Sequence, residues 1–211
     1  MTTIGIFGTS GFAREVADVV DALGDHPVLI ARTAAEADET AFKGDVILED
    51  AVGADPDMRY AIGIGENAVR ERVARRFEDR LTFPTLIHPS ATFGIGQRAE
   101  IAARRGTIVC AGVRFTNHID VGDFAVFNLN ATIGHDCVIE DFVNVSPGVA
   151  ISGNVHLRTR SWIGTGAAVN QGTNEAKLVV GADTVIGSGA VVVASCDDQA
   201  VYVGIPAKRI R

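Results

Sequence analysis

The chain has 211 residues, of which 47% are hydrophobic and 21% are charged, and its formal net charge is −7. This length suits one large domain or two small ones, with enough apolar side chains for packed cores. The excess of acidic residues argues against binding to nucleic acids or to acidic membranes, because their phosphates attract Lys and Arg.

The cysteines and the N-terminal sequence bear on the cellular compartment. The three cysteines, Cys110, Cys137 and Cys196, form no CxxC pair, which disfavours a disulfide framework or a zinc knuckle. No basic leader precedes the first apolar run, and no apolar stretch reaches the roughly 20 residues that span a bilayer. These features predict a cytoplasmic protein without a membrane span.

Residues 1–85 alternate short apolar runs with helical periodicity. Four apolar runs predict buried strands: Ile4–Phe7, Val28–Ile30, Val46–Leu48 and Tyr60–Ile64. The segment Phe12–Leu23 repeats its apolar residues on one face of a helix, and so does Val69–Phe77. Strands and helices in this order predict a small α/β domain with a parallel sheet. Prolines at 84 and 89 mark its end.

Beyond Pro89 the apolar period changes to six. From Phe115 to Val169 every sixth residue is large and apolar, and the pattern resumes at Val180 after a slip. Strands repeat every two residues and helices every 3.6, so neither explains a period of six. A triangular solenoid does: each hexad forms one face, its apolar residue points to the axis, and the small residue after it permits the corner. Three hexads, or eighteen residues, then make one coil.

The hexads resemble the left-handed parallel β-helix of hexapeptide acyltransferases, and Val203–Lys208 is similar to the G-x-P-A-[KR] tail of that superfamily. The motifs Gly8–Gly11, Ile64–Asn67 and Ile87–Ser90 narrow the resemblance to the NeuD/PglD family of sugar O- and N-acetyltransferases, over nearly the whole chain. The resemblance implies a Rossmann-like nucleotide-sugar-binding domain over residues 1–85 and a β-helical acetyltransferase domain over residues 86–211. It also implies a homotrimer that uses acetyl-CoA and no metal.

His135 is the candidate general base. It lies near a predicted corner, and Asp136 follows it, where a carboxylate would hold the imidazole tautomer or stabilise the imidazolium. Gly153 stands eighteen residues later, one coil along, and its N–H is unshielded by a side chain, so it would polarise a thioester carbonyl. In the family the matching histidine is the general base and the matching glycine amide meets the acetyl carbonyl, so the resemblance implies these roles for His135 and Gly153.

The resemblance also implies residues for the cofactor, which lies between neighbouring solenoids in the family. Gly164 and Ser188 stand in the coils expected to line that groove. Some relatives carry a second histidine nine residues after the first; here Asn144 stands there, able to donate a hydrogen bond but not to act as a base. Residues 171–178 interrupt the hexads, either as a simple bulge or as a rim of the cofactor groove.

The loop Gly8–Gly11 lies between the first strand and its helix, where a helix N-terminus favours a phosphate. The family positions that bind the nucleotide sugar are matched by Ser10, Gly11, Phe12 and Gly65. Relatives commonly carry an acidic pair after the second strand that reads uracil. Here the segment 30–33 has no acid and contains Arg32, so the sequence does not decide whether the nucleobase of the substrate is uracil or another base.

These features predict an acetyl-CoA-dependent N-acetyltransferase that acts on a nucleotide-linked amino sugar in bacterial surface-glycan synthesis, by direct transfer with His135 as base. A sugar or small-molecule O-acetyltransferase and a non-catalytic scaffold remain as alternatives. A γ-type carbonic anhydrase would need three zinc-binding histidines, and the chain has no HxxxxH pair. An NAD-dependent dehydrogenase is disfavoured, because Arg32 replaces the acid that would hold the ribose.

Overall fold

The computed structural model describes residues 1–211 and begins with a four-stranded parallel sheet in the order β3-β2-β1-β4. Its strands are β1 Thr3–Phe7, β2 His26–Ala31, β3 Asp45–Leu48 and β4 Arg59–Ile62. All three strand pairs are parallel. The four predicted strands are therefore confirmed, with ends that differ by one or two residues.

The helices of this first domain are α1 Gly11–Ala22, α2 Ala34–Glu39 and α3 Asn67–Phe77, with a 3-10 turn at Glu49–Ala51. The α1 helix buries Val16, Val19 and Val20 of its predicted apolar face, whereas Phe12 is half-buried and Leu23, just after the helix, is exposed. The α3 helix differs from the prediction, because Val69 and Val73 are only partly buried whereas Arg70 is fully buried. The two helices cover opposite faces of the sheet, because α1 packs with Ile6 and Leu29, whereas α3 packs with the alternate strand residues Phe7 and Ile30.

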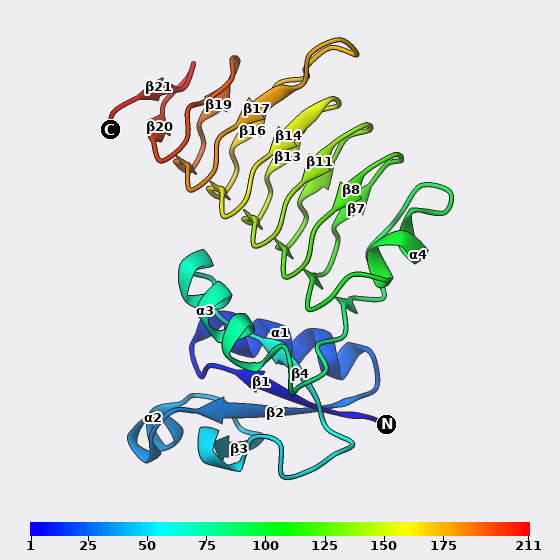
Figure 1. The fold of residues 1–211 in the computed structure, drawn as a ribbon, viewed down its shortest axis with the longest axis vertical. Coiled ribbons are helices and arrows are strands. Elements are labelled where there is room, and N and C mark those ends of the chain that lie inside the picture. The colour runs from blue at the N-terminus through cyan, green and yellow to red at the C-terminus, as the bar shows by residue number, and fades with distance from the viewer.

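The second domain is a left-handed parallel β-helix with three sheets, each built from short strands of successive coils (Figure 1). The junction face contains β5 Leu86–Ile87, β6 Ile108–Val109, β9 Val126–Phe127, β12 Asn144–Val145, β15 Trp162–Ile163, β18 Val185–Ile186, β20 Val201–Val203 and β21 Lys208–Arg209. The five-stranded face contains β7 Arg114–Phe115, β10 Thr132–Ile133, β13 Ala150–Ile151, β16 Ala168–Val169 and β19 Val191–Val192. The four-stranded face contains β8 Asp120–Val121, β11 Val138–Ile139, β14 Val155–Leu157 and β17 Leu178–Val180.

The predicted inward residues form the core of this β-helix. From Phe115 to Val169, every sixth side chain is 3% exposed or less, and all belong to one apolar cluster. The ladder pairs residues eighteen apart, as in Ile133 with Ile151 and Asn144 with Trp162. The helix α4, Gln97–Ala102, lies at the first coil. None of the helices combines the length and the apolar character that a membrane crossing requires.

The corners are made differently from the prediction. A Cβ on Gly134 would lie 2.6 Å from the backbone nitrogen of Gly153, so the glycine after an inward residue permits close approach between coils. Left-handed residues form the corners instead, and they recur once per coil. The outer corner, between the five- and four-stranded faces, has His118, Asp136 and Asn154; the junction corner has Phe124, Phe142 and Arg160; the glycine corner has Gly112, Asn130, Gly148, Gly166 and Gly189.

Candidate active site

The outer corner places an imidazole beside a carboxylate. His135 Nδ1 lies 2.7 Å from Asp136 Oδ2, and the two side chains are 53% and 46% exposed. The hydrogen bond from His135 holds the pKa of the Asp136 carboxyl below its usual value, so this group is ionised at neutral pH and only accepts. The proton therefore sits on Nδ1, and His135 Nε2 keeps a lone pair that can take a proton.

Gly153 supports the imidazole from the next coil. A Cβ on Gly153 would lie 2.5 Å from both Nε2 and Cε1 of His135. The backbone of Gly153 is therefore packed against the ring, and no other residue type leaves room for the ring in this position. The Gly153 N–H donates no hydrogen bond within the chain. The structure thus brings together His135, Asp136, which was predicted as its neighbour in sequence, and Gly153, which was predicted from the coil spacing.

The predicted cofactor residues lie elsewhere on the β-helix. Gly164 and Ser188 are neighbours in adjacent coils, since a Cβ on Gly164 would lie 2.7 Å from the Ser188 nitrogen. They lie at the glycine corner, a different edge of the β-helix from His135. Asn144 lies on the junction face and is 4% exposed; its Nδ2 donates to the Gly65 carbonyl oxygen at 3.0 Å.

The carboxyl ends of β1 and β4 present an open helix N-terminus. Gly8 has a φ of 112° and turns the chain from β1 toward α1. Ser10 caps α1 without a side-chain hydrogen bond, Gly11 is exposed at its first position, and Phe12 is half-buried behind them. The unpaired amides of this first turn carry partial positive charge and suit an anion such as a phosphate.

Arg32 lies at the end of β2, beside β1, and is paired with an acid. Its Nε donates to Glu36 Oε1 at 2.9 Å, and its backbone N–H donates to Glu36 Oε2 at 2.9 Å. This pairing raises the pKa of Arg32 and lowers that of Glu36. The segment 30–33 contains no acidic residue, but Glu36 of α2 places a carboxylate at the end of β2.

A polar network that the sequence did not predict joins the two domains. Arg70 is fully buried; its Nε donates to the Phe124 carbonyl oxygen at 2.9 Å and its Nη2 to that of Phe142 at 2.7 Å. Asn67 Nδ2 donates to the Arg160 carbonyl oxygen at 2.8 Å. Two side chains of α3 thus bind the left-handed residues of three successive coils.

The same arginine holds the loop after β4. Arg70 Nη1 donates to the Gly65 carbonyl oxygen at 2.8 Å, so this oxygen accepts from both Arg70 and Asn144. Burial lowers the pKa of the Arg70 guanidinium, and the carbonyl oxygens around it compensate the loss of water. A Cβ on Gly65 would lie 4.0 Å from the Trp162 ring, so this loop lies against the junction face.

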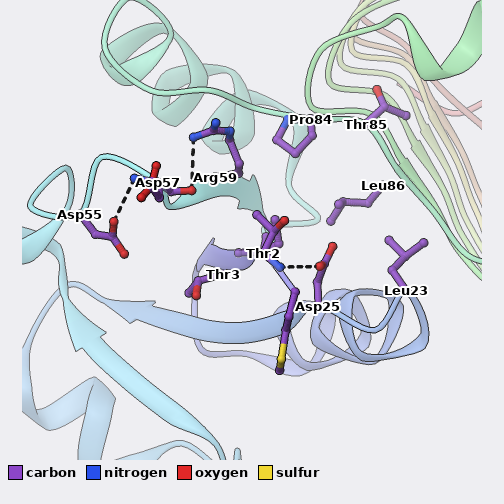
Figure 2. Close-up of a pocket in the computed structure, with 12 residues that line it drawn as sticks. Thr2, Thr3, Leu23, Asp25, Asp55, Asp57, Arg59, Pro84, Thr85 and Leu86 are labelled. Carbon is purple, nitrogen blue, oxygen red and sulfur yellow. Dashed lines mark hydrogen bonds between the residues drawn. The ribbon is translucent and has the colours of Figure 1, made fainter.

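A cavity of about 540 Å³ lies at the opposite edge of the sheet (Figure 2). It surrounds the amino ends of β1 and β4, where Asp25, Asp55 and Asp57 line it. Asp25 Oδ1 accepts from the Thr2 backbone nitrogen at 2.7 Å. Parallel sheets bind ligands at the carboxyl ends of their strands, and an acidic lining repels phosphates, so this cavity is not the nucleotide site.

Known proteins share this architecture. A model of the PglD N-terminal domain matches residues 3–77. The GDP-perosamine N-acetyltransferase of Escherichia coli O157:H7 is 26% identical over 190 residues, which cover 86% of this chain and 84% of that protein.

Two solved structures match the chain over almost its full length. PerB from Caulobacter crescentus, in complex with CoA and GDP-perosamine, has a TM-score of 0.86 and 27% identity and covers 100% of this chain and 98% of its own. The acetyltransferase domain of PglB from Neisseria gonorrhoeae FA1090, in complex with acetyl coenzyme A, has a TM-score of 0.85 and 27% identity and covers 99% of this chain and 98% of its own. The match to the PglD N-terminal domain over residues 3–77, the hexapeptide β-helix and these full-length matches all support the similarity of the chain to the NeuD/PglD family of sugar acetyltransferases.

Proposed function

We propose that the protein transfers an acetyl group from acetyl-CoA to the amine of a nucleotide-linked amino sugar. The observation that carries the proposal is the outer corner, where an ionised Asp136 occupies Nδ1 of the half-exposed His135 and leaves its Nε2 without a hydrogen-bond partner. The open N-terminus of α1 supplies a site for the diphosphate. The similarity to a GDP-perosamine N-acetyltransferase and to PerB, a protein crystallised with CoA and GDP-perosamine, supports this class of substrate.

In the proposed mechanism His135 Nε2 takes a proton from the sugar amine while the nitrogen attacks the thioester carbonyl. The Gly153 N–H, which has no acceptor in the chain, donates to the developing oxyanion. The C–N bond forms, the C–S bond breaks, and the proton on His135 passes to the departing CoA thiolate. Asp136 stabilises the transient imidazolium. Both substrates meet in one groove, so no acyl-enzyme is needed.

We propose that the active site is shared between subunits of a homotrimer in the cytoplasm. Within one chain, Gly65 lies against the junction face and Gly8 lies beside the same loop at Gly63, whereas His135 is at the outer corner. The loop between β16 and β17, orange in Figure 1, projects from that outer edge, far from α3. A second copy is needed to bring His135 to these loops, and three-fold symmetry closes such a contact into a ring.

Residues 1–85 bind the nucleotide sugar and residues 86–211 carry the acetyl transfer in this proposal. Ser10, Gly11 and Phe12 hold the diphosphate, and Gly65 lies beside the sugar. At the end of β2, Arg32 offers a hydrogen-bond donor and its partner Glu36 offers an acceptor for the nucleobase. In the trimer, Gly164 and Ser188 line the groove for acetyl-CoA, whereas Asn144, which is buried against Gly65, orders the loop beside the sugar instead.

A thiol-release assay with acetyl-CoA tests the function. The acceptors are GDP-, UDP-, dTDP- and CMP-linked amino sugars and their hydroxyl counterparts. We expect thiol release with an amino sugar on one nucleotide, GDP first, and none with its hydroxyl counterpart. Release with hydroxyl sugars alone would show an O-acetyltransferase. If no acceptor leads to thiol release and acetyl-CoA does not bind, the result would favour a scaffold without enzymatic activity.

A further inference from the structure

Residues 170–177 form an enlarged turn at the outer corner. The preceding coil turns from β13 to β14 with only residues 152–154 between them, and the coil before it turns from β10 to β11 with residues 134–137. The enlarged turn therefore belongs to the coil that follows Gly153, and it is seen as the orange loop in Figure 1. The extra residues are thus inserted at the one corner that carries His135.

This turn is fastened to the coil below it. The Gly172 backbone nitrogen donates to the Gly153 carbonyl oxygen at 3.1 Å, and the Leu178 nitrogen donates to the Asn154 carbonyl oxygen at 3.0 Å. Asn154 Nδ2 also donates to Asn174 Oδ1 at 3.2 Å. Both ends and the middle of the turn are therefore hydrogen-bonded to the corner that contains Gly153.

Lys177 extends from the turn past this coil to the next one. Its Nζ donates a hydrogen bond to the backbone carbonyl oxygen of Asp136. The Asp136 backbone nitrogen donates to the Asn117 carbonyl oxygen at 3.2 Å. Asp136 has a φ of 56°, a conformation that costs a non-glycine residue energy and needs support from its surroundings. Lys177 supplies that support from one side and Asn117 from the other.

We infer that Lys177 is a positioning residue, which fixes the Asp136 peptide so that the carboxylate stays on His135 Nδ1. The Asp136 side chain is short and half-exposed, so its direction is set by its backbone rather than by packing. If the peptide turns, the carboxylate leaves the imidazole and the Nδ1–H tautomer loses its acceptor. The inference rests on the proposed function only for its effect on turnover.

A direct contact between Lys177 and CoA would have a different signature. A residue that only binds the cofactor changes the KM for acetyl-CoA and leaves kcat unchanged, whereas a residue that positions the base changes kcat. A second prediction distinguishes the two without any substrate. If Lys177 positions Asp136, its loss changes the tautomer of His135 in the free protein.

The test compares the full-length wild type with Lys177→Met, Lys177→Arg and, as a control on the same turn, Glu175→Gln. Glu175 is exposed and makes no hydrogen bond through its side chain. We expect Lys177→Met to lower kcat about tenfold with an unchanged KM for acetyl-CoA. Lys177→Arg, which keeps a long donor, is expected to restore most of the activity, and Glu175→Gln to match the wild type.

Nitrogen NMR of the imidazoles at alkaline pH gives the readout that does not depend on turnover. The wild type is expected to show His135 protonated on Nδ1, and Lys177→Met to shift it toward the Nε2–H form. His156, which pairs with Glu140 on the four-stranded face, serves as the internal reference. If the wild type acetylates nothing while the tautomer still shifts, the proposed function fails and the positioning role stands. An unchanged tautomer with unchanged kcat, or a change in the KM for acetyl-CoA alone, would overturn the inference.

Discussion

Replacing His135 with Ala is expected to lower kcat by about 10²–10⁴-fold and to leave the affinity for acetyl-CoA nearly unchanged. The substitution removes the nitrogen that the Asp136 contact leaves free to accept a proton at the outer corner. The side chain is about half exposed, so its loss opens no cavity in the core. Thiol release gives kcat, and calorimetry gives the dissociation constant of acetyl-CoA.

His156→Gln is the matched control for this substitution. His156 also pairs with a carboxylate, Glu140, at 2.6 Å, but it lies on the four-stranded face, away from the outer corner. We expect its kcat to stay within about twofold of the wild type, since a side chain outside the site contributes little to transition-state binding. Full activity of His135→Ala would disprove the role of His135 as the base.

Replacing Gly153 with Ala is expected to lower kcat by about 10²-fold, because displacement of a reacting group by ~1 Å costs that much. The added methyl would lie 2.5 Å from His135 Nε2 and Cε1, so the ring must move away from its present position. Gly153 does not have a left-handed φ, so the backbone tolerates alanine and the chain still folds. Steady-state kinetics measures kcat, and a thermal melt checks the fold.

Ser152→Ala is the control for Gly153→Ala. Ser152 is the exposed neighbour of Gly153 at the same corner, and its hydroxyl makes no hydrogen bond in the chain. We expect it to keep wild-type kcat and melting temperature. A folded Gly153→Ala protein with wild-type kcat would show that the imidazole does not need its place against the glycine backbone.

The β-helix could be predicted because its determinant is local and repeated. Every coil buries its residues at the same positions, so apolar residues recur every six positions in the sequence. The same spacing placed Gly153 above His135. The role of the glycines was predicted wrongly, because a glycine that permits close approach, such as Gly134, cannot be told in sequence from one that permits a left-handed turn.

The junction between the domains could not be predicted, because its partners are far apart in the chain. The periodicity of α3 favoured Val69 and Val73 as buried residues, yet Arg70 is the side chain that is fully buried. Its acceptors Phe124 and Phe142 lie 54 and 72 residues away. Backbone carbonyls carry no sequence signal, so nothing in the helix marked this arginine.

Two contacts of the candidate site could also not be predicted from the sequence. Asn144 meets Gly65, a residue 79 positions away, and the interruption at 171–178 gave no sign that Lys177 would reach Asp136. The acid beside Arg32 was missed for a simpler reason. It comes from Glu36, outside the segment 30–33 that was compared with relatives, and it reaches back one helical turn.

A mixed-subunit assay tests the shared active site most directly. One variant, His135→Ala, lacks the base; the other, Gly11→Glu, places a negative charge at the open N-terminus of α1 and so repels the diphosphate. Each alone is expected to be inactive. In trimers assembled from equal amounts of both, about a quarter of the interfaces combine an intact His135 with an intact loop, so about a quarter of the wild-type activity should return. No recovery in verified mixed trimers would place both halves of the site in one chain and contradict the shared site.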